Sequence, residues 1–451
     1  MNLLVNTMIK PFYIKSLIAL VLPSQLLFAG DLQQIIALAH TQDATYQSAI
    51  HKFSSDKENY TQALSRFMPT ISYKYSDLDT TQKINESANF LSPLGKDDFE
   101  TKDHGLTINQ PLFDMEIWSR FQLSKSTVNR AESELLTAGQ DLLLRSSEAY
   151  FLVLEREDQL DTIRDEKTAL NKHFTMAQQK KRAGLGRRVD VDTAEARYLE
   201  AVAKEIELES RLLDSHYALA EITGSVMDNL NRLSEKVDYQ LPKPADVKWW
   251  VDKAQTLNPA IIAKEQALKE AKHEVSARKT KHYPTVNLTY TNGNLDTQES
   301  IFSDASDIDS QRLELRLDIP LFQGFYVKSR VQQALSDSYR SEDELRQLQR
   351  QVERNVRDAY QRINASIMQI KALTRSVEAQ KRMLDLKTKG YNAGRYTLLE
   401  VLDAQKDFAS QQQGRTKARY DYVLNILRLK AAAGIITIED IQYVNNWLTV
   451  S

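Results

Sequence analysis

Apolar positions along this chain repeat with two different periods. Over 313–321, leucine and isoleucine alternate with Glu314, Arg316 and Asp318, and over 71–76 isoleucine and tyrosine alternate with polar residues. A period of two predicts strands that are apolar on one face and charged or polar on the other. Such strands fit the edge of a sandwich, or a barrel with lipid outside and water inside.

Proline-free stretches with apolar stripes follow the strands and predict helices. The stretch 114–182 would form a helix about 100 Å long at ~1.5 Å per residue, which no compact domain needs. In 187–224, apolar residues follow a heptad that starts at Val191. This spacing predicts coiled-coil packing, and an ordinary helical bundle is the alternative. The length of the helices favours the coiled coil. Helices are also expected over 31–66 and 247–281, and polar loops over 80–100 and 293–310.

The same order of elements occurs twice. The span 183–224 corresponds to 393–434 at a constant offset of 210 residues. Two proline motifs of the strand segments also have counterparts at slightly different offsets: Pro69-Thr70-Ile71 with Pro284-Thr285-Val286, and Gln110-Pro111-Leu112-Phe113 with Ile319-Pro320-Leu321-Phe322. A unit of two strands and three helices therefore occurs twice, and the fold is expected to have quasi-symmetry.

The N-terminal segment has the pattern of a signal peptide. Lys10 and Lys15 precede a short apolar run, and Leu27-Phe28-Ala29 is a suitable cleavage site. An uncleaved membrane anchor is the alternative, but the run is short for a bilayer. We expect these segments: a signal peptide at 1–29; repeat 1 at 30–240, with a helix, a β-hairpin at 69–113 and long helices at 114–182 and 187–224; and repeat 2 at 241–451, with a helix, a β-hairpin at 284–322, long helices at 325–389 and 397–433, and a short C-terminal tail.

Composition supports extended helices and narrows the function. Gly (13) and Pro (10) are scarce while 27% of residues are charged, which favours long helices. A net charge of −2 gives no support for nucleic-acid binding. The chain has no cysteine, its histidines show no metal-ligand spacing, and no P-loop, dinucleotide fingerprint or catalytic triad signature is present. We therefore expect no enzyme activity, cofactor or metal. An enzyme with a site in a β-barrel and a periplasmic coiled-coil scaffold remain as alternatives.

Four motifs resemble the TolC family of outer-membrane channel proteins. The segments 106–114 and 319–324 resemble its junctions between strand and helix, 390–404 resembles the helix-turn at its periplasmic tip, and 418–425 resembles the stretch that follows. The resemblance covers essentially the whole mature chain. It implies a mixed α and β fold and a homotrimer, in which each protomer gives four strands to one 12-stranded transmembrane β-barrel. The resemblance further implies that a long periplasmic α-helical coiled-coil barrel continues the β-barrel. Four strands alone would leave open edges in lipid.

The resemblance also implies a function and partners. The protein would be the outer-membrane exit duct of a tripartite export system, with a periplasmic adaptor (membrane fusion protein) and an inner-membrane ABC or proton-driven pump. Its cargo would be proteins, as in type I secretion, or small toxic molecules, and the wording of 398–405 is slightly closer to secretion members. A periplasmic adaptor without its own channel is the alternative, although adaptors typically offer one helical hairpin. The chain stops about 17 residues after Gly434, so the C-terminal part of the equatorial belt should be short.

Site residues follow from the same resemblance. Acidic residues matching Glu400 and Asp403 ring the periplasmic aperture in the family, and Asp190 and Tyr391 match a latch between tip helices. Glu400 also completes a capping box, and Asp190 suits a helix first turn, so both have purely structural explanations. Tyr396 stands where the best-known member has an arginine, which puts one latch contact in doubt.

Two further sets of residues complete the expected sites. The tip turns would dock the adaptor through Gly184, Leu185, Gly394 and Arg395, where the glycines most simply supply turn conformations. The strand alternation predicts a barrel lumen lined by Lys74, Glu314, Arg316 and Asp318, and a lipid face with Tyr73, Val286, Leu315 and Leu317.

Overall fold

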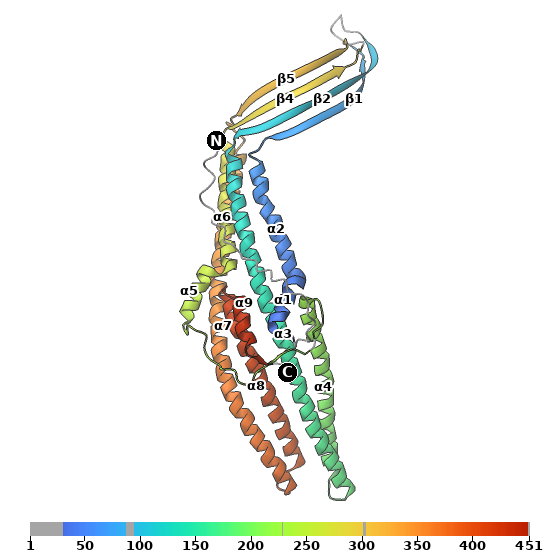
Figure 1. The fold of residues 1–451 in the computed structure, drawn as a ribbon, viewed down its shortest axis with the longest axis vertical. Coiled ribbons are helices and arrows are strands. Elements are labelled where there is room, and N and C mark those ends of the chain that lie inside the picture. The colour runs from blue at the N-terminus through green and yellow to red at the C-terminus, as the bar shows by residue number, and fades with distance from the viewer. Residues whose placement is uncertain (1–29, 87–93, 228, 301–303, 450–451) are drawn as a thin grey trace, which may run out of the picture.

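The protein is long and narrow, with a β-sheet at one end and two helical tips at the other (Figure 1). The structure is a computed structural model that describes residues 30–86, 94–227, 229–300 and 304–449. The signal peptide expected at 1–29 lies outside the described residues. Long helices connect the sheet to the tips.

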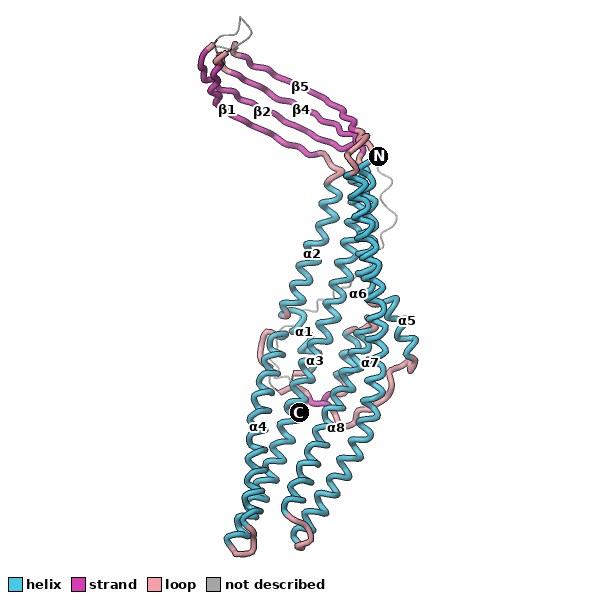
Figure 2. Tube along the Cα trace, turned by 180° about the vertical axis from the view of Figure 1, so that it is seen from behind, coloured by secondary structure: helices cyan, strands magenta, loops and turns pink. Residues whose placement is uncertain are grey.

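The sheet has four antiparallel strands in the order β1-β2-β4-β5 (Figure 2). Among the described residues, β1 and β5 are its outer strands, and each pairs on one side only. Their unpaired edges present backbone donors and acceptors for another strand. The strands are β1 (Thr70–Ile84), β2 (Gly95–Phe113), β4 (Thr285–Thr297) and β5 (Ser306–Asp318).

The strands are longer than their apolar positions predict. Polar loops were expected at 80–100 and 293–310, but both hairpin ladders continue into these segments. The expectation was wrong because backbone hydrogen bonds build a ladder without apolar side chains. Polar cross-strand contacts accompany it, such as the hydrogen bond that the Thr81 hydroxyl donates to Asp98.

The register sorts the strand residues between two faces of the sheet. Residues directly opposite each other on neighbouring strands share a face, and neighbours along a strand alternate. One face carries Lys74, Glu314, Arg316 and Asp318, and the other carries Tyr73, Val286, Leu315 and Leu317. In the single chain Lys74 and Asp318 are both exposed.

In the part of the chain that the structure describes, six helices run along the long axis. Four of them connect to the sheet, and α3 and α7 are long enough to continue to the tips; α3 has 68 residues and so is about 100 Å long. The other two, α4 and α8, return from the tips. Within the described residues, no helix combines the length and the apolar character needed to cross a membrane. The six are α2 (Ala44–Ser65), α3 (Met115–Arg182), α4 (Arg188–Thr223), α6 (Pro259–Lys279), α7 (Tyr326–Asn392) and α8 (Leu398–Ala432).

Two of the expected helices are each divided by a capping residue. The helix expected over 31–66 is interrupted at Asp43, which ends α1 (Leu32–Gln42) and accepts a hydrogen bond from the Tyr46 N–H at the start of α2. Asn258 similarly separates α5 (Val247–Leu257) from α6 and caps it, with proline at the first position of α6. These side chains compete with the helix for backbone N–H groups.

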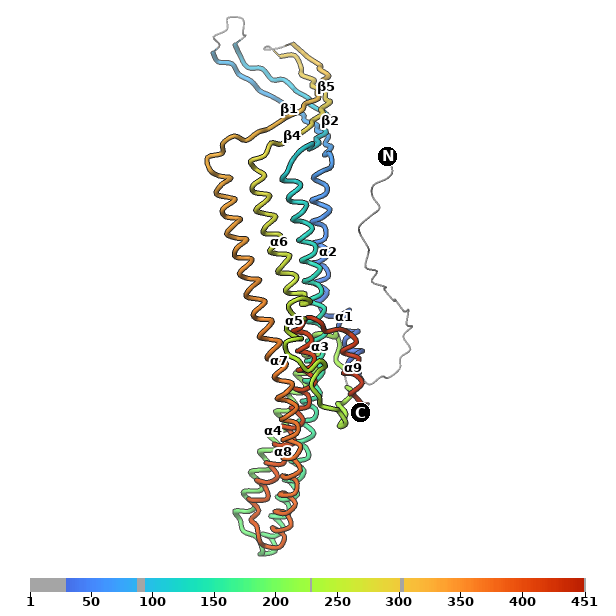
Figure 3. The backbone as a smooth tube through the Cα atoms, turned by 90° about the vertical axis from the view of Figure 1, so that its left-hand side faces the viewer, coloured from blue at the N-terminus to red at the C-terminus, as the bar shows by residue number. Residues whose placement is uncertain are grey.

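A hydrophobic belt lies near mid-length, where short elements wrap the long helices (Figure 3). Its centre holds the fully buried aromatic residues Tyr150, Phe151 and Tyr422. The C-terminal tail, expected to be short, still adds to the belt: Ile441 and Val444 of α9 (Ile438–Asn445) are 0% exposed. Beside it, β6 (Leu448–Thr449) pairs with β3 (Arg232–Leu233). The belt thus joins segments from both ends of the chain.

Candidate functional site

The two tip turns have the same backbone design. Gly184 and Gly394 each have φ = +75°, a conformation that side chains with a Cβ resist. In each turn, a backbone N–H reaches back five residues: Leu185 donates to Lys180 at 2.9 Å, and Arg395 donates to Gly390 at 2.8 Å. Nothing lies within 4 Å of a Cβ placed on either glycine. Both turns therefore project into open space, as needed for a docking surface.

The helices form two helical hairpins, α3–α4 and α7–α8, each closed by one tip turn. A cation–π contact links these two hairpins close to the turns. The Lys180 Nζ of α3 lies 4.2 Å from the centroid of the Tyr391 ring of α7. Such contacts are worth about 0.5–1 kcal/mol at exposed sites. Tyr391 is half-buried and packs against the apolar cluster that fills the lower part of the bundle. Tyr391, a predicted latch residue, therefore contacts α3 through Lys180, which the sequence did not indicate.

Asp190, the second predicted latch residue, pairs with its own helix terminus. The Arg187 guanidinium donates to both carboxylate oxygens of Asp190, at 2.9 and 3.2 Å. This hydrogen bond raises the pKa of Arg187, and the Tyr391 side chain raises it further by a smaller charge effect. Asp190 and Tyr391 therefore lie near one arginine. Within the part of the chain that the structure describes, no direct hydrogen bond joins their side chains.

Glu400 occupies the structural position that its capping box predicts. Its carboxylate accepts a hydrogen bond from the Thr397 N–H at 2.8 Å, and the Thr397 hydroxyl accepts one from the Glu400 N–H at 3.3 Å. These bonds lower the pKa of Glu400, so its negative charge is secured at neutral pH. The cap fixes where this charge sits, directly after the tip turn.

Asp403 connects α8 to α4. Its Oδ1 accepts a hydrogen bond from Arg197 Nη2 at 3.0 Å, and the same guanidinium reaches Glu200 at 3.1 Å. Lys406 of α8 lies 3.5 Å from Glu200 and adds a second link. The predicted aperture residue is therefore partly exposed and also forms an ion pair between the two hairpins. Sequence reasoning missed Arg197, because 206 residues separate it from Asp403.

Glu166 of α3 is a further acid in this region that the sequence did not indicate. It lines a cavity of about 400 Å³ between α3, α4 and α8, together with Arg197, Glu200 and Lys406. Burial, and then the negative charge of Glu200, raise its pKa to about 7. A carboxyl group that titrates near neutral pH makes this region sensitive to pH.

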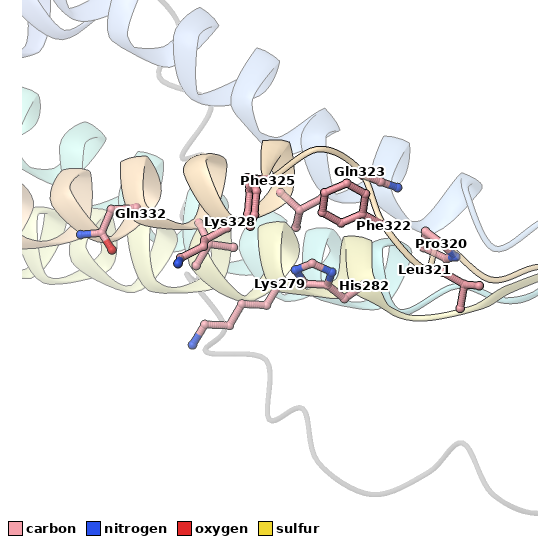
Figure 4. A pocket seen from close by; sticks show the side chains of 11 residues that line it. Lys279, His282, Pro320, Leu321, Phe322, Gln323, Phe325, Lys328 and Gln332 are labelled. Atoms are coloured by element: carbon pink, nitrogen blue, oxygen red, sulfur yellow. The ribbon is translucent and has the colours of Figure 1, made fainter.

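An apolar hollow lies at the other end of the helices, where β5 leads into α7 (Figure 4). It measures about 420 Å³, and its lining includes Pro320, Phe322 and Phe325, together with His282. Leu321, which also lines it, is 92% exposed. Exposed apolar side chains therefore gather where the outer strand β5 leads into α7.

The family model described as outer membrane efflux protein matches this chain twice, at residues 35–225 and 250–435. The chain belongs to this family. The first matched range contains the β1–β2 hairpin and the long helices α3 and α4. The second contains the β4–β5 hairpin and the long helices α7 and α8. As a TolC-family member it is an outer-membrane protein with a large periplasmic part.

Relatives of this TolC-family protein include outer membrane proteins and secretion proteins. It is 27% identical over 430 residues to the outer membrane protein TolC of Vibrio cholerae, covering 95% of this chain and 96% of that one. It is 25% identical to the alkaline protease secretion protein AprF of Pseudomonas aeruginosa, covering 92% and 87%. The family is one of transport proteins rather than enzymes.

Solved structures share the fold of this TolC-family protein. The CmeC outer membrane channel of Campylobacter jejuni superposes with a TM-score of 0.79 at 14% identity, covering 93% of this chain and 90% of that one. The outer-membrane channel OprN superposes with a TM-score of 0.77 at 16% identity, covering 89% of each.

Proposed function

We propose that this protein is a homotrimeric exit duct in the outer membrane, which passes cargo from an inner-membrane pump to the outside. The observation that carries this proposal is the four-stranded sheet with two unpaired edges, joined directly to helices that reach about 100 Å away. Membership of the outer membrane efflux family supports it. Three copies would supply the strands of a 12-stranded barrel and leave no open edge in lipid.

The two faces of the sheet support this arrangement. Leu315 and Leu317 would contact lipid, while Glu314, Arg316 and Asp318 would line a water-filled lumen. Lys74 of β1 lies on the same polar face. A lumen with both signs of charge would give cargo no single strong binding site, as suits a duct.

The helical tips would form the periplasmic entrance. Three copies of Glu400 and Asp403 would place six carboxylates around the aperture and favour cations. In each copy the ion pair of Asp403 with Arg197, and the contact of Lys180 with Tyr391, would hold the two hairpins together. Opening then requires the α7–α8 hairpin to move away from the α3–α4 hairpin.

The exposed turns at the tips would dock a periplasmic adaptor. Leu185 is 83% exposed and offers an apolar contact, and Arg395 supplies a positive charge on the second turn. Gly184 and Gly394 would allow a partner helix to approach closely. The adaptor would connect the duct to an ABC or proton-driven pump. The cargo would be proteins or small toxic molecules. The secretion relatives, such as AprF, favour proteins.

Cross-linking and conductance test this proposal together. The detergent-solubilised protein, treated with an amine-reactive reagent, should give a ladder that ends at three chains. The same preparation should form channels of low conductance in planar bilayers, because the entrance is closed in the absence of an adaptor. A stable monomer that forms no channels would contradict the proposal.

A further inference from the structure

We propose that strand β5 of one copy pairs with strand β1 of the next in the register that sets Asp318 opposite Lys74 of the partner subunit. The two would form an ion pair on the polar face of the barrel at each seam between copies. This inference rests on the trimer proposed above, and it adds the register and the residues that define the seam.

The two hairpins of this chain have equivalent registers. The proline motifs relate β1 to β4 by an offset of 215 residues and β2 to β5 by an offset of 209. Within the hairpins, Thr70 pairs with Asn109, and Thr285 pairs with Asp318. Thr285 follows Thr70 by 215 residues, and Asp318 follows Asn109 by 209 residues. The offsets of the proline motifs therefore also relate the pairing in one hairpin to the pairing in the other.

The pairing of β2 with β4 is therefore an internal template for the seam between copies. In the closed barrel, β5 of one copy would be followed by β1 of the next copy. This contact is equivalent to the contact of β2 with β4 inside one chain, because each joins the end of one hairpin to the start of the next. In the template, Asn109 lies opposite Thr289. Adding 209 to the first position gives Asp318, and subtracting 215 from the second gives Lys74.

Side chains at the template pair reach each other. The Thr289 hydroxyl lies 2.6 Å from Asn109 Oδ1 and donates a hydrogen bond to it. The polar contact of the internal seam thus has a charged counterpart at the seam between copies. Lys74 already lies 3.5 Å from Asp103 of its own chain. It would therefore stand between two carboxylates.

Neighbouring pairs of this register agree with the membrane-facing side. The same offsets set Leu317 opposite Tyr75 of the partner subunit and Ile319 opposite Tyr73 of the partner subunit. A slip by two residues keeps the faces but sets Arg316 opposite Lys74 of the partner subunit, two like charges that repel across a strand pair. Charge therefore favours the proposed register over this slipped one.

Paired cysteines test the register directly, because the chain contains no cysteine of its own. The full chain with Lys74→Cys and Asp318→Cys should form disulfide-linked trimers on oxidation, which denaturant leaves intact and reductant releases. Residues directly opposite have Cβ atoms ~4.5–5.5 Å apart, close to the ~3.5–4.5 Å of a disulfide and within reach of a short bifunctional thiol-reactive cross-linker. The matched control combines Lys74→Cys with Arg316→Cys and should stay largely unlinked.

The possible outcomes separate this inference from the proposed trimer. Amine-reactive cross-linking of the unsubstituted protein reports the trimer whatever the register. If that trimer forms but the control pair links instead, or neither pair links, the register is overturned while the duct stands. If no trimer forms, the proposed function itself fails.

A charge exchange tests the ion pair. Lys74→Asp should lower the yield of trimer by about tenfold, since three pairs are lost at once and like charges then face each other. Adding Asp318→Lys should restore part of the yield, because Asp103 of the same chain still faces the new carboxylate at position 74. If the double variant assembles no better than Lys74→Asp alone, the two residues do not face each other.

Discussion

Arg197 of α4 donates a hydrogen bond to Asp403 of α8 at 3.0 Å, and so one side chain pair ties together the two hairpins that end at the tips. The pair is partly exposed, with side-chain exposures of 30% and 48%. Each such pair is worth about 0.2–1 kcal/mol, so a small applied force or a binding partner could break it.

Breaking this pair should open the entrance. We expect Arg197→Ala to raise single-channel conductance in planar bilayers, because three links between α4 and α8 are lost in the trimer. Glu207→Ala is the matched control, since it removes an ion pair with Lys204 inside α4 at 2.7 Å. Equal conductance of Arg197→Ala and the unsubstituted protein would show that the link does not limit opening.

The acidic ring should set ion selectivity. Glu400→Gln combined with Asp403→Asn should lower the preference for cations, measured as a reversal potential across a salt gradient. Glutamine keeps the hydrogen bonds of a capping box, so the fold of α8 is preserved while the charge is removed. Unchanged selectivity would assign Glu400 to helix capping alone.

The alternation of β5 predicts unequal effects of two neighbouring substitutions. Leu315→Arg would place a charge against lipid at a cost of about 2–4 kcal/mol near the midplane, whereas Arg316→Leu changes the lumen. We therefore expect Leu315→Arg to reduce the amount of assembled trimer much more. Similar losses for both would mean that the faces are assigned the wrong way or that the sheet is not in lipid.

Glu166 should make stability depend on pH. Its pKa is raised to about 7 from 4.5, so the folded protein keeps this proton to higher pH than the unfolded chain does. Stability from this group is therefore present in acid and is lost as pH rises from about 4.5 to about 7. Glu166→Gln should abolish that loss: its melting temperature should exceed that of the unsubstituted protein at pH 8 and match it at pH 5. The exposed Glu195→Gln should keep the original pH dependence.

Much of the architecture could be predicted because it depends on local patterns. Alternating leucines over 313–321 determine a strand with two unlike faces, and proline-free stretches determine long helices. What the patterns missed lies where polar residues act structurally. Asp43 divides a helix by capping α2 and pairing with Arg145 at 3.1 Å, and nothing in the apolar spacing signals it.

The site was predicted less completely, since its contacts join distant segments. The resemblance identified Asp403 and Tyr391, but their partners, Arg197 and Lys180, belong to the other half of the chain. Glu166 looked like one solvated acid among many on a charged helix. Only the packing of α3 against α4 and α8 reveals its burial.

The belt at mid-length has a mechanical consequence. One end of α4 and one end of α8 pack in the belt, while their other ends reach the tips. α4 has 36 residues, so the arm from belt to tip is about 54 Å long at ~1.5 Å per residue. A pivot of about 5° at the belt would displace the tip by about 5 Å for an arm of that length. In the proposed duct, the tip helices would therefore move apart while the belt core stays packed. The contacts that must break for this movement are a few side-chain contacts at the tips, far from the pivot.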